Sequence, residues 1–105
     1  MTTLQQSERE WISAIRGKYE ERIMCEVSTP AGVLALVAFG YENYPEPSRF
    51  AVSLDGVLLR SPSSILYTDC SDTDVIEKVV NAFPHLKISL SILSLAVGEM
   101  EYLPW

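Results

Sequence analysis

An unbroken run of seven apolar residues, Val33 to Phe39, is the strongest constraint on how this chain folds. It is the longest such run in the sequence, yet far shorter than the roughly 20 apolar residues that a membrane-spanning helix requires. A run of this length that is apolar at every position is typical of a strand covered on both faces. We therefore expect a sheet in which Val33–Phe39 is a central strand.

Shorter segments around this run alternate between apolar and polar residues or flank a tight turn, as antiparallel strands do. In one of them, the residues Ile23, Cys25 and Val27 form a predicted apolar face. The dipeptide Asp55-Gly56 is the strongest hairpin signal in the sequence. The predicted strands besides the central one are Ile23–Ser28, Arg49–Leu54, Val57–Arg60 and Ile65–Thr68.

Two segments carry the signals of helices. Ser7–Glu10 fits a capping box, and apolar residues recur at helical spacing behind it, so a helix is expected from about residue 8 to residue 17–21. Ser71–Asp74 opens a second predicted helix, which Pro84 ends. The residues expected to be largely buried are Leu36, Phe39, Val79, Val80 and Phe83.

The segment from residue 86 to residue 97 fits either a strand or a helix. Its apolar residues first alternate with Lys87, Ser89 and Ser91, which is the period of a strand, and a bulge would explain the later change of phase. The positions that also fit helical spacing are Leu86, Leu90, Leu93 and Val97. The β-branched and serine residues favour the strand, which we predict, with the helix as the alternative.

Together these elements predict one α+β domain that covers residues 1–105. We expect a mainly antiparallel sheet of about five strands, with an N-terminal helix and a second helix packed on one face. The length of 105 residues suits a single domain, and a hydrophobic content of 48% is sufficient for a core.

The expected compartment is the cytoplasm. The first ten residues show neither the basic nor the apolar region of a secretory signal. Cys25 and Cys70 are far apart in the sequence and form no CxxC pair, so both are predicted to be reduced thiols.

No motif in the sequence indicates catalysis, a cofactor or a metal. Neither of the glycine-rich phosphate-binding motifs occurs. Asp69–Asp74 resembles half of a calcium loop but lacks its glycine and its final glutamate, so capping of a helix is the predicted role. The single histidine, His85, follows a helix stop and is predicted to be structural. We therefore expect no enzyme, no cofactor and no metal site.

The charge is strongly asymmetric along the chain. Eight Lys and Arg residues stand against 14 Asp and Glu residues, which gives a net charge of -6, and the whole excess lies beyond residue 22. A protein that binds nucleic acid directly needs a basic surplus, so that class is not expected. Acids next to aromatic residues are typical of a surface that binds a basic protein. The predicted partner-binding residues are Tyr41, Glu42, Tyr44, Glu46, Asp69, Asp72, Asp74, Glu99, Glu101, Tyr102 and Trp105.

The sequence thus favours a non-enzymatic acidic binding protein. The specific hypothesis is a bacterial toxin-immunity or inhibitor protein that neutralises a basic toxin such as a nuclease, because nucleases present cationic clefts to their substrate. The alternative is a small acidic secretion chaperone or another homodimeric interaction module that uses an apolar helix stripe or an edge strand. A simpler interpretation is that the acids only keep the domain soluble. No membrane partner is expected, and the chain could be a monomer or a homodimer.

Overall fold

The central apolar run forms strand β2 (Gly32–Gly40), which lies between two other strands of an antiparallel sheet. The computed structural model describes residues 4–6, 10, 20–40, 49–61, 64–65, 67–68 and 72–100. The strands follow the order β1-β2-β3-β4, and β7 also pairs with β3, so the predicted antiparallel sheet is confirmed. The bounds of these strands are β1 (Glu20–Thr29), β3 (Arg49–Leu54), β4 (Val57–Leu58) and β7 (Tyr67–Thr68).

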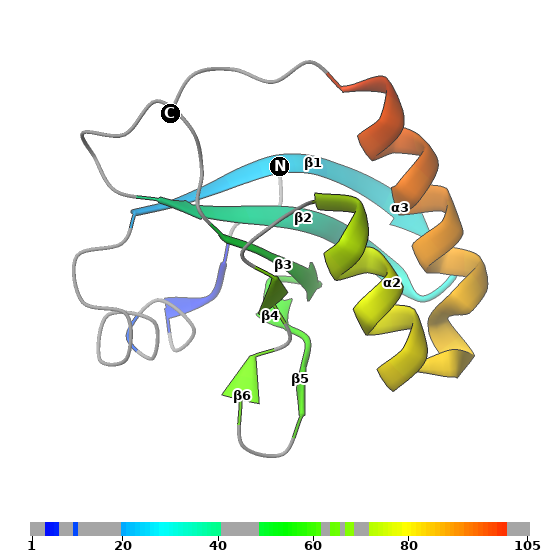
Figure 1. Cartoon of the computed structure of the whole chain (residues 1–105), viewed down its shortest axis with the longest axis horizontal. Coiled ribbons are helices and arrows are strands. Elements are labelled where there is room, and N and C mark those ends of the chain that lie inside the picture. The colour runs from blue at the N-terminus through cyan, green and yellow to red at the C-terminus, as the bar shows by residue number, and fades with distance from the viewer. Residues whose placement is uncertain are drawn as a thin grey trace.

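Strands β4 and β7 share one edge of β3. After β4, the amide of Leu59 donates a hydrogen bond to the Val52 carbonyl at 2.9 Å, and the pairing of β3 then continues with Tyr67 in β7. Between them the chain leaves the sheet and forms a small hairpin of β5 (Arg60–Ser61) and β6 (Ser64–Ile65). Figure 1 shows this hairpin projecting away from the sheet and the helices.

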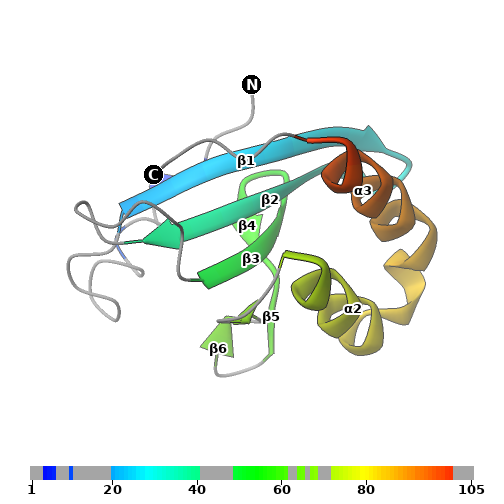
Figure 2. The same ribbon diagram turned by 45° about the horizontal axis from the view of Figure 1, so that its top comes forward.

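Two helices lie on one face of the sheet, as Figures 1 and 2 show from different directions. Helix α2 (Asp72–Ala82) matches the second predicted helix, and a short 3-10 turn, η1 (Pro84–Leu86), follows it. Helix α3 (Lys87–Glu99) occupies the segment for which we predicted a strand, and that prediction was wrong. The apolar residues that α3 and η1 bury are those at helical spacing, namely Leu86, Leu90, Leu93 and Val97, and Ser89 is buried beside them.

The main core lies between these helices and the sheet. It joins alternate residues of β2 and β3 to the inner faces of α2 and α3. Leu36 and Val79 are buried there, as predicted, whereas Val80 and Phe83 are only half-buried at its margin. Phe39 is also buried, but on the opposite face of the sheet. The cost of Phe83→Ala is therefore expected to fall below the 3–5 kcal/mol or so typical of a fully buried phenylalanine.

A β-bulge in β1 changes which residues face the main core. Ile23 pairs with Val37 and Cys25 pairs with Leu36, so Met24 is an extra residue on this strand. An extra residue shifts the following side chains to the other face. Ile23 consequently packs on the opposite face from Cys25, and the prediction that both share one face was wrong.

The second face of the sheet carries a smaller core, in which Leu4 packs with residues of β2, β3 and β4. The Gln5 amide donates a hydrogen bond to the Gly56 carbonyl at 3.2 Å, which attaches this N-terminal segment to the β3–β4 turn. The predicted N-terminal helix is not among the described elements. Gln6 and Glu10 have helical backbones, residues 7–9 and 11–19 lie outside the described residues, and β1 already begins at Glu20. Of the range 17–21 that was predicted for the end of this helix, residues 20 and 21 are therefore excluded.

Candidate functional site

Only part of the predicted partner-binding surface can be located in the structure. Asp72 is the first residue of α2, Asp74 is exposed in its first turn, and Glu99 is exposed as the last residue of α3. The other predicted residues lie outside the described residues, namely Tyr41, Glu42, Tyr44, Glu46, Asp69, Glu101, Tyr102 and Trp105.

The described acids of the predicted surface, Asp72, Asp74 and Glu99, belong to helix ends that lie on the same side of the helical layer. The axes of α2 and α3 turn by 120° where the two helices are joined. Because the chain reverses there, the start of α2 and the end of α3 both lie away from the connection, as Figure 1 shows. Asp74 near the start of α2 and Glu99 at the end of α3 are thus brought to one side of the molecule, although they are 25 positions apart in the sequence.

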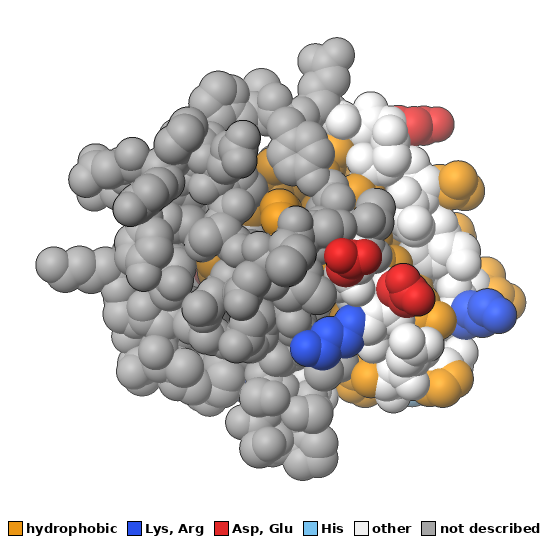
Figure 3. Space-filling view, viewed as in Figure 1, with side chains coloured by type: hydrophobic (Ala, Val, Ile, Leu, Met, Phe, Trp, Pro, Cys, Tyr) orange, Lys and Arg blue, Asp and Glu red, His pale blue; other side chains and the backbone are white. Residues whose placement is uncertain are grey.

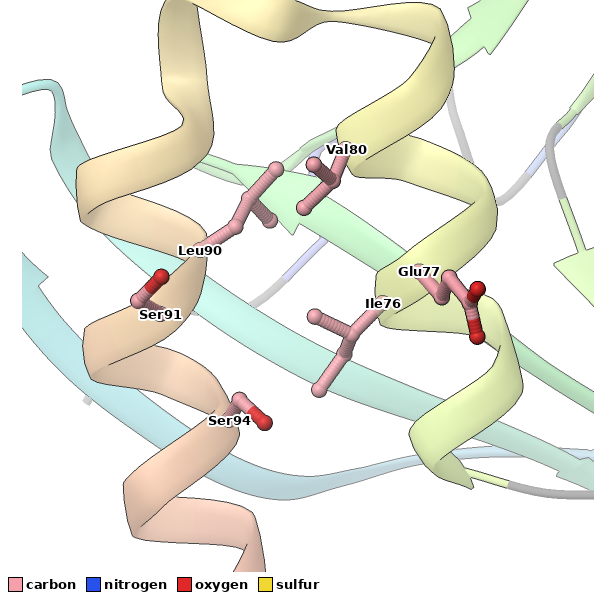
Figure 4. Close-up of a pocket in the computed structure, with 6 residues that line it drawn as sticks. All are labelled: Ile76, Glu77, Val80, Leu90, Ser91 and Ser94. Atoms are coloured by element: carbon pink, nitrogen blue, oxygen red, sulfur yellow. The ribbon is translucent and has the colours of Figure 1, made fainter.

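A groove between α2 and α3 was not predicted from the sequence. It encloses about 300 Å³, and Figure 4 shows Ile76 and Val80 of α2 facing Leu90 and Ser94 of α3 across it. Ser91 and the exposed Glu77 complete its lining. The groove is thus apolar at its base, with two hydroxyl groups on one wall and a carboxylate at its margin.

Next to this groove, the outer face of α3 carries a stripe of large apolar side chains. Ile88 and Leu95 are 76% and 73% exposed, and Ile92 is 37% exposed. These residues recur at intervals of four and three positions, which places them on one side of the helix. Figure 3 shows apolar side chains reaching the surface over the helices, together with acidic and basic ones. Exposed apolar side chains that cluster in this way mark an interaction surface.

Helical spacing was the one signal in the sequence that could have revealed this stripe. Ile88, Ile92 and Leu95 fit a helix as well as the buried residues of α3 do. The strand prediction instead assigned Ile88 and Ile92 to the same face as Leu90, which is fully buried. The strand prediction therefore implied that Ile88 and Ile92 are buried, and it gave no indication of an exposed apolar surface on α3.

Few side chains among the described residues are arranged as a metal or catalytic centre would require. Among the described residues, no three His, Cys, Asp or Glu side chains lie close enough to hold a metal ion together. His85 is exposed in the 3-10 turn, with its ring 6.0 Å from that of Phe83 in an edge-to-face arrangement. Cys25 is a free, half-buried thiol on β1, and Cys70 lies outside the described residues.

Burial on the helical side of β1 raises the pKa of the Cys25 thiol above its ordinary value, and the neighbouring Glu26 carboxylate raises it further. The folded state therefore holds this proton more tightly than the unfolded state. The contribution of this proton to the stability of the fold is complete below the pKa that Cys25 has in the unfolded protein. It is lost as the pH rises through the higher pKa that Cys25 has in the folded protein. Cys25 is thus a neutral thiol at pH 7, and a neutral thiol is a poor nucleophile.

We expect iodoacetamide to alkylate Cys25 more slowly in the native protein than in the urea-unfolded protein at about pH 8.5, close to the ordinary pKa of a thiol. Peptide mapping by mass spectrometry would follow Cys25 separately from Cys70. In the native Glu26→Gln variant, the alkylation rate of Cys25 should rise only part of the way toward the rate in the unfolded protein, because burial is the larger cause of the raised pKa. Equal rates in the native and unfolded states would contradict the raised pKa.

Comparison with protein families, with curated proteins and with solved structures finds no match for this chain.

Neither described helix is by itself long and apolar enough to span a membrane. Asp74–Ala82 and Pro84–Glu99 reach the required length and apolar content only when they are taken together across their 120° bend.

Proposed function

We propose that this chain is a non-enzymatic acidic binding protein, and more specifically a toxin-immunity or inhibitor protein that neutralises a basic protein such as a nuclease toxin. The observation that supports this proposal is the position of Asp74 and Glu99 on the same side of the helical layer, where both are exposed. Exposed carboxylates from two helix ends that are distant in sequence thereby lie on one side of the molecule. A surface with such charges attracts a cationic cleft and accelerates the encounter with it.

The charge balance of the whole chain agrees with this proposal. The first 22 residues carry equal numbers of acids and bases, so the net charge of -6 belongs to residues 23–105, and α2 and α3 contribute four acids and two bases to it. A partner that presents a cleft for a polyanion would meet the complementary potential there.

The secretion chaperone, our second candidate, is favoured by a different observation. The exposed stripe of Ile88, Ile92 and Leu95 gives a client or a second subunit an apolar helix face to bind. A chaperone of this kind would bind its client through the stripe, whereas an immunity protein would bind its toxin through the acids. Variants of the two surfaces therefore separate the two functions.

The test of the main proposal uses the reading frame next to the gene. If that frame encodes a basic toxic protein, co-expression of the present chain should restore growth. In binding kinetics with the purified toxin, the double variant Asp74→Lys, Glu99→Lys should associate about tenfold more slowly at low salt, because it removes electrostatic steering. The difference should shrink at high salt, since salt screens exposed charges.

The double variant Glu8→Lys, Glu10→Lys provides a control for net charge, because it makes the same change of charge in the segment where acids and bases balance. This control should associate nearly as fast as the natural chain. Reversal of Glu42 and Glu46 should act like reversal of the helix acids, and truncation of Tyr44 should act mainly on dissociation, as for a buried anchor. Unchanged rates for all of these variants would leave the acids with a role in solubility only.

A further inference from the structure

The outer seam of α3 combines large and small residues in a regular order. Ile88, Ser91, Leu95 and Gly98 are all exposed, and they follow one another at intervals of three, four and three positions. This is the spacing of the seam along which two helices pack in a coiled coil. A Cβ atom added at Gly98 would meet nothing within 4 Å, so the chain itself leaves space beside this glycine.

Two copies of this seam fit together when the two α3 helices run antiparallel and cross at the level of Leu93 in each helix. Ile88 of one copy then reaches the level of Gly98 of the second copy, and Leu95 reaches the level of Ser91. Every layer combines one large and one small side chain, which allows the two helices to approach closely. A two-fold axis produces such a contact, because it repeats each pair at both ends of the interface.

The charges at the two ends of α3 fit the same arrangement. Lys87 is the first residue of the helix and Glu99 is the last, and both are exposed. This order opposes the helix dipole, which favours an acid at the N-terminus and a base at the C-terminus. Antiparallel pairing brings Lys87 of one copy and Glu99 of the second copy to the same end. Charges that are unfavourable within one helix would then attract each other across the interface.

We infer that the partner for the outer face of α3 is a second copy of this chain, bound through a two-fold symmetric, antiparallel contact between the two α3 helices. The contact buries Ile88 and Leu95 against Gly98 and Ser91, and it pairs Lys87 with Glu99 at both ends. This inference does not depend on the toxin proposal, because its partner is a second copy of this chain. The two proposals share Glu99, so Gly98→Leu, which changes no charge, tests the dimer separately from the binding of a toxin.

Sedimentation equilibrium of the full chain between about 1 and 500 μM tests the inference, because small interfaces dissociate in this range. The natural chain should form a reversible dimer. Gly98→Leu should raise the dissociation constant at least about tenfold, because two layers would each contain two large side chains. Asn81→Leu places the same side chain on an exposed position of α2 and should leave the constant unchanged. Circular dichroism should show native folding for both variants.

A charge swap tests the direction of the helices. Lys87→Glu and Glu99→Lys should each weaken the dimer by about fivefold or more, because like charges then meet at both ends of the interface. The double variant Lys87→Glu, Glu99→Lys should restore the affinity of the natural chain. A natural chain that stays monomeric throughout the range, or a Gly98→Leu variant that dimerises as tightly as the natural chain, would overturn the inference. A double variant as weak as the single variants would exclude the antiparallel arrangement.

Discussion

Replacing Leu90 with alanine should lower the free energy of unfolding by about 2–5 kcal/mol, the cost of removing a large side chain from a packed core. Leu90 is fully buried and joins α3 to the core formed by α2 and the sheet. The alanine side chain leaves a cavity that rigid neighbours fill only in part, and this cavity adds to the lost hydrophobic transfer energy. Urea denaturation followed by circular dichroism, at a low protein concentration, would measure the change.

Leu95→Ala is the matched control, because it makes the same chemical change on the same helix at a position that is 73% exposed. Its cost should stay within about 0.5 kcal/mol, as for most surface substitutions. The comparison with Ile88→Ala is also informative. If residues 86–97 formed a strand, Ile88 and Leu90 would share one face, and their substitution would cost similar amounts. Similar losses for these two variants would contradict helix α3.

Strands β2 and β3, the β3–β4 turn and α2 could be predicted because their local signals agree with their tertiary environment. The predicted strands Val57–Arg60 and Ile65–Thr68 were wrong in their bounds, because each is divided between the main sheet and the β5–β6 hairpin. Val33–Phe39 is apolar throughout, and the structure covers both faces of β2. Asp55-Gly56 forms the turn that its type suggests, with positive φ angles of 50° and 86°. Asp72–Ala82 begins with acids, ends before Pro84 and buries one apolar stripe.

Helix α3 could not be predicted with the same rules because it is apolar on two sides. Its inner residues Leu90 and Leu93 pack on the core, whereas Ile88 and Ile92 lie on the outer face. Read along the sequence, the inner and outer residues interleave at every second position and imitate a strand. Assignment from hydrophobic periodicity assumes that each element has one apolar face. Helix α3 has a second apolar face, and this is the face on which we infer a second copy of the chain.

The bulge in β1 and the candidate surfaces were hidden for another reason. The extra residue Met24 has no signature in the sequence, because it is defined by the pairing of β1 with β2. The placement of Asp74 and Glu99 on one side of the molecule likewise depends on how α3 reverses after α2, which local periodicity does not contain. Acidic residues could therefore be proposed as a binding surface, but their arrangement could not.

Replacing Gly32 with alanine should destabilise the protein by about 2–4 kcal/mol, because it strains the backbone and displaces a hydrogen-bonded carboxylate. Gly32 has a φ angle of 132°, and a Cβ atom there would lie 2.6 Å from Oδ2 of Asp55. That carboxylate accepts a hydrogen bond from the Val33 amide at 2.8 Å, and the Asp55 amide donates to the Val33 carbonyl at 2.8 Å. The glycine thus allows the β1–β2 turn to approach the β3–β4 turn closely.

Gly98→Ala is the control for this prediction, since it makes the same change inside α3 where nothing lies within 4 Å of the new atom. It should stabilise the protein by about 0.5–1 kcal/mol, because alanine is the better helix former. In an Asp55→Ala background, Gly32→Ala should cost only the backbone strain of about 1–3 kcal/mol, because the carboxylate is no longer there to be displaced. Thermal and urea unfolding would be measured for the natural chain, Gly32→Ala, Asp55→Ala and the double variant, which together form a double-mutant cycle, and for the control Gly98→Ala. If Gly32→Ala cost the same with and without the Asp55 carboxylate, the close approach of the two turns would contribute nothing to stability.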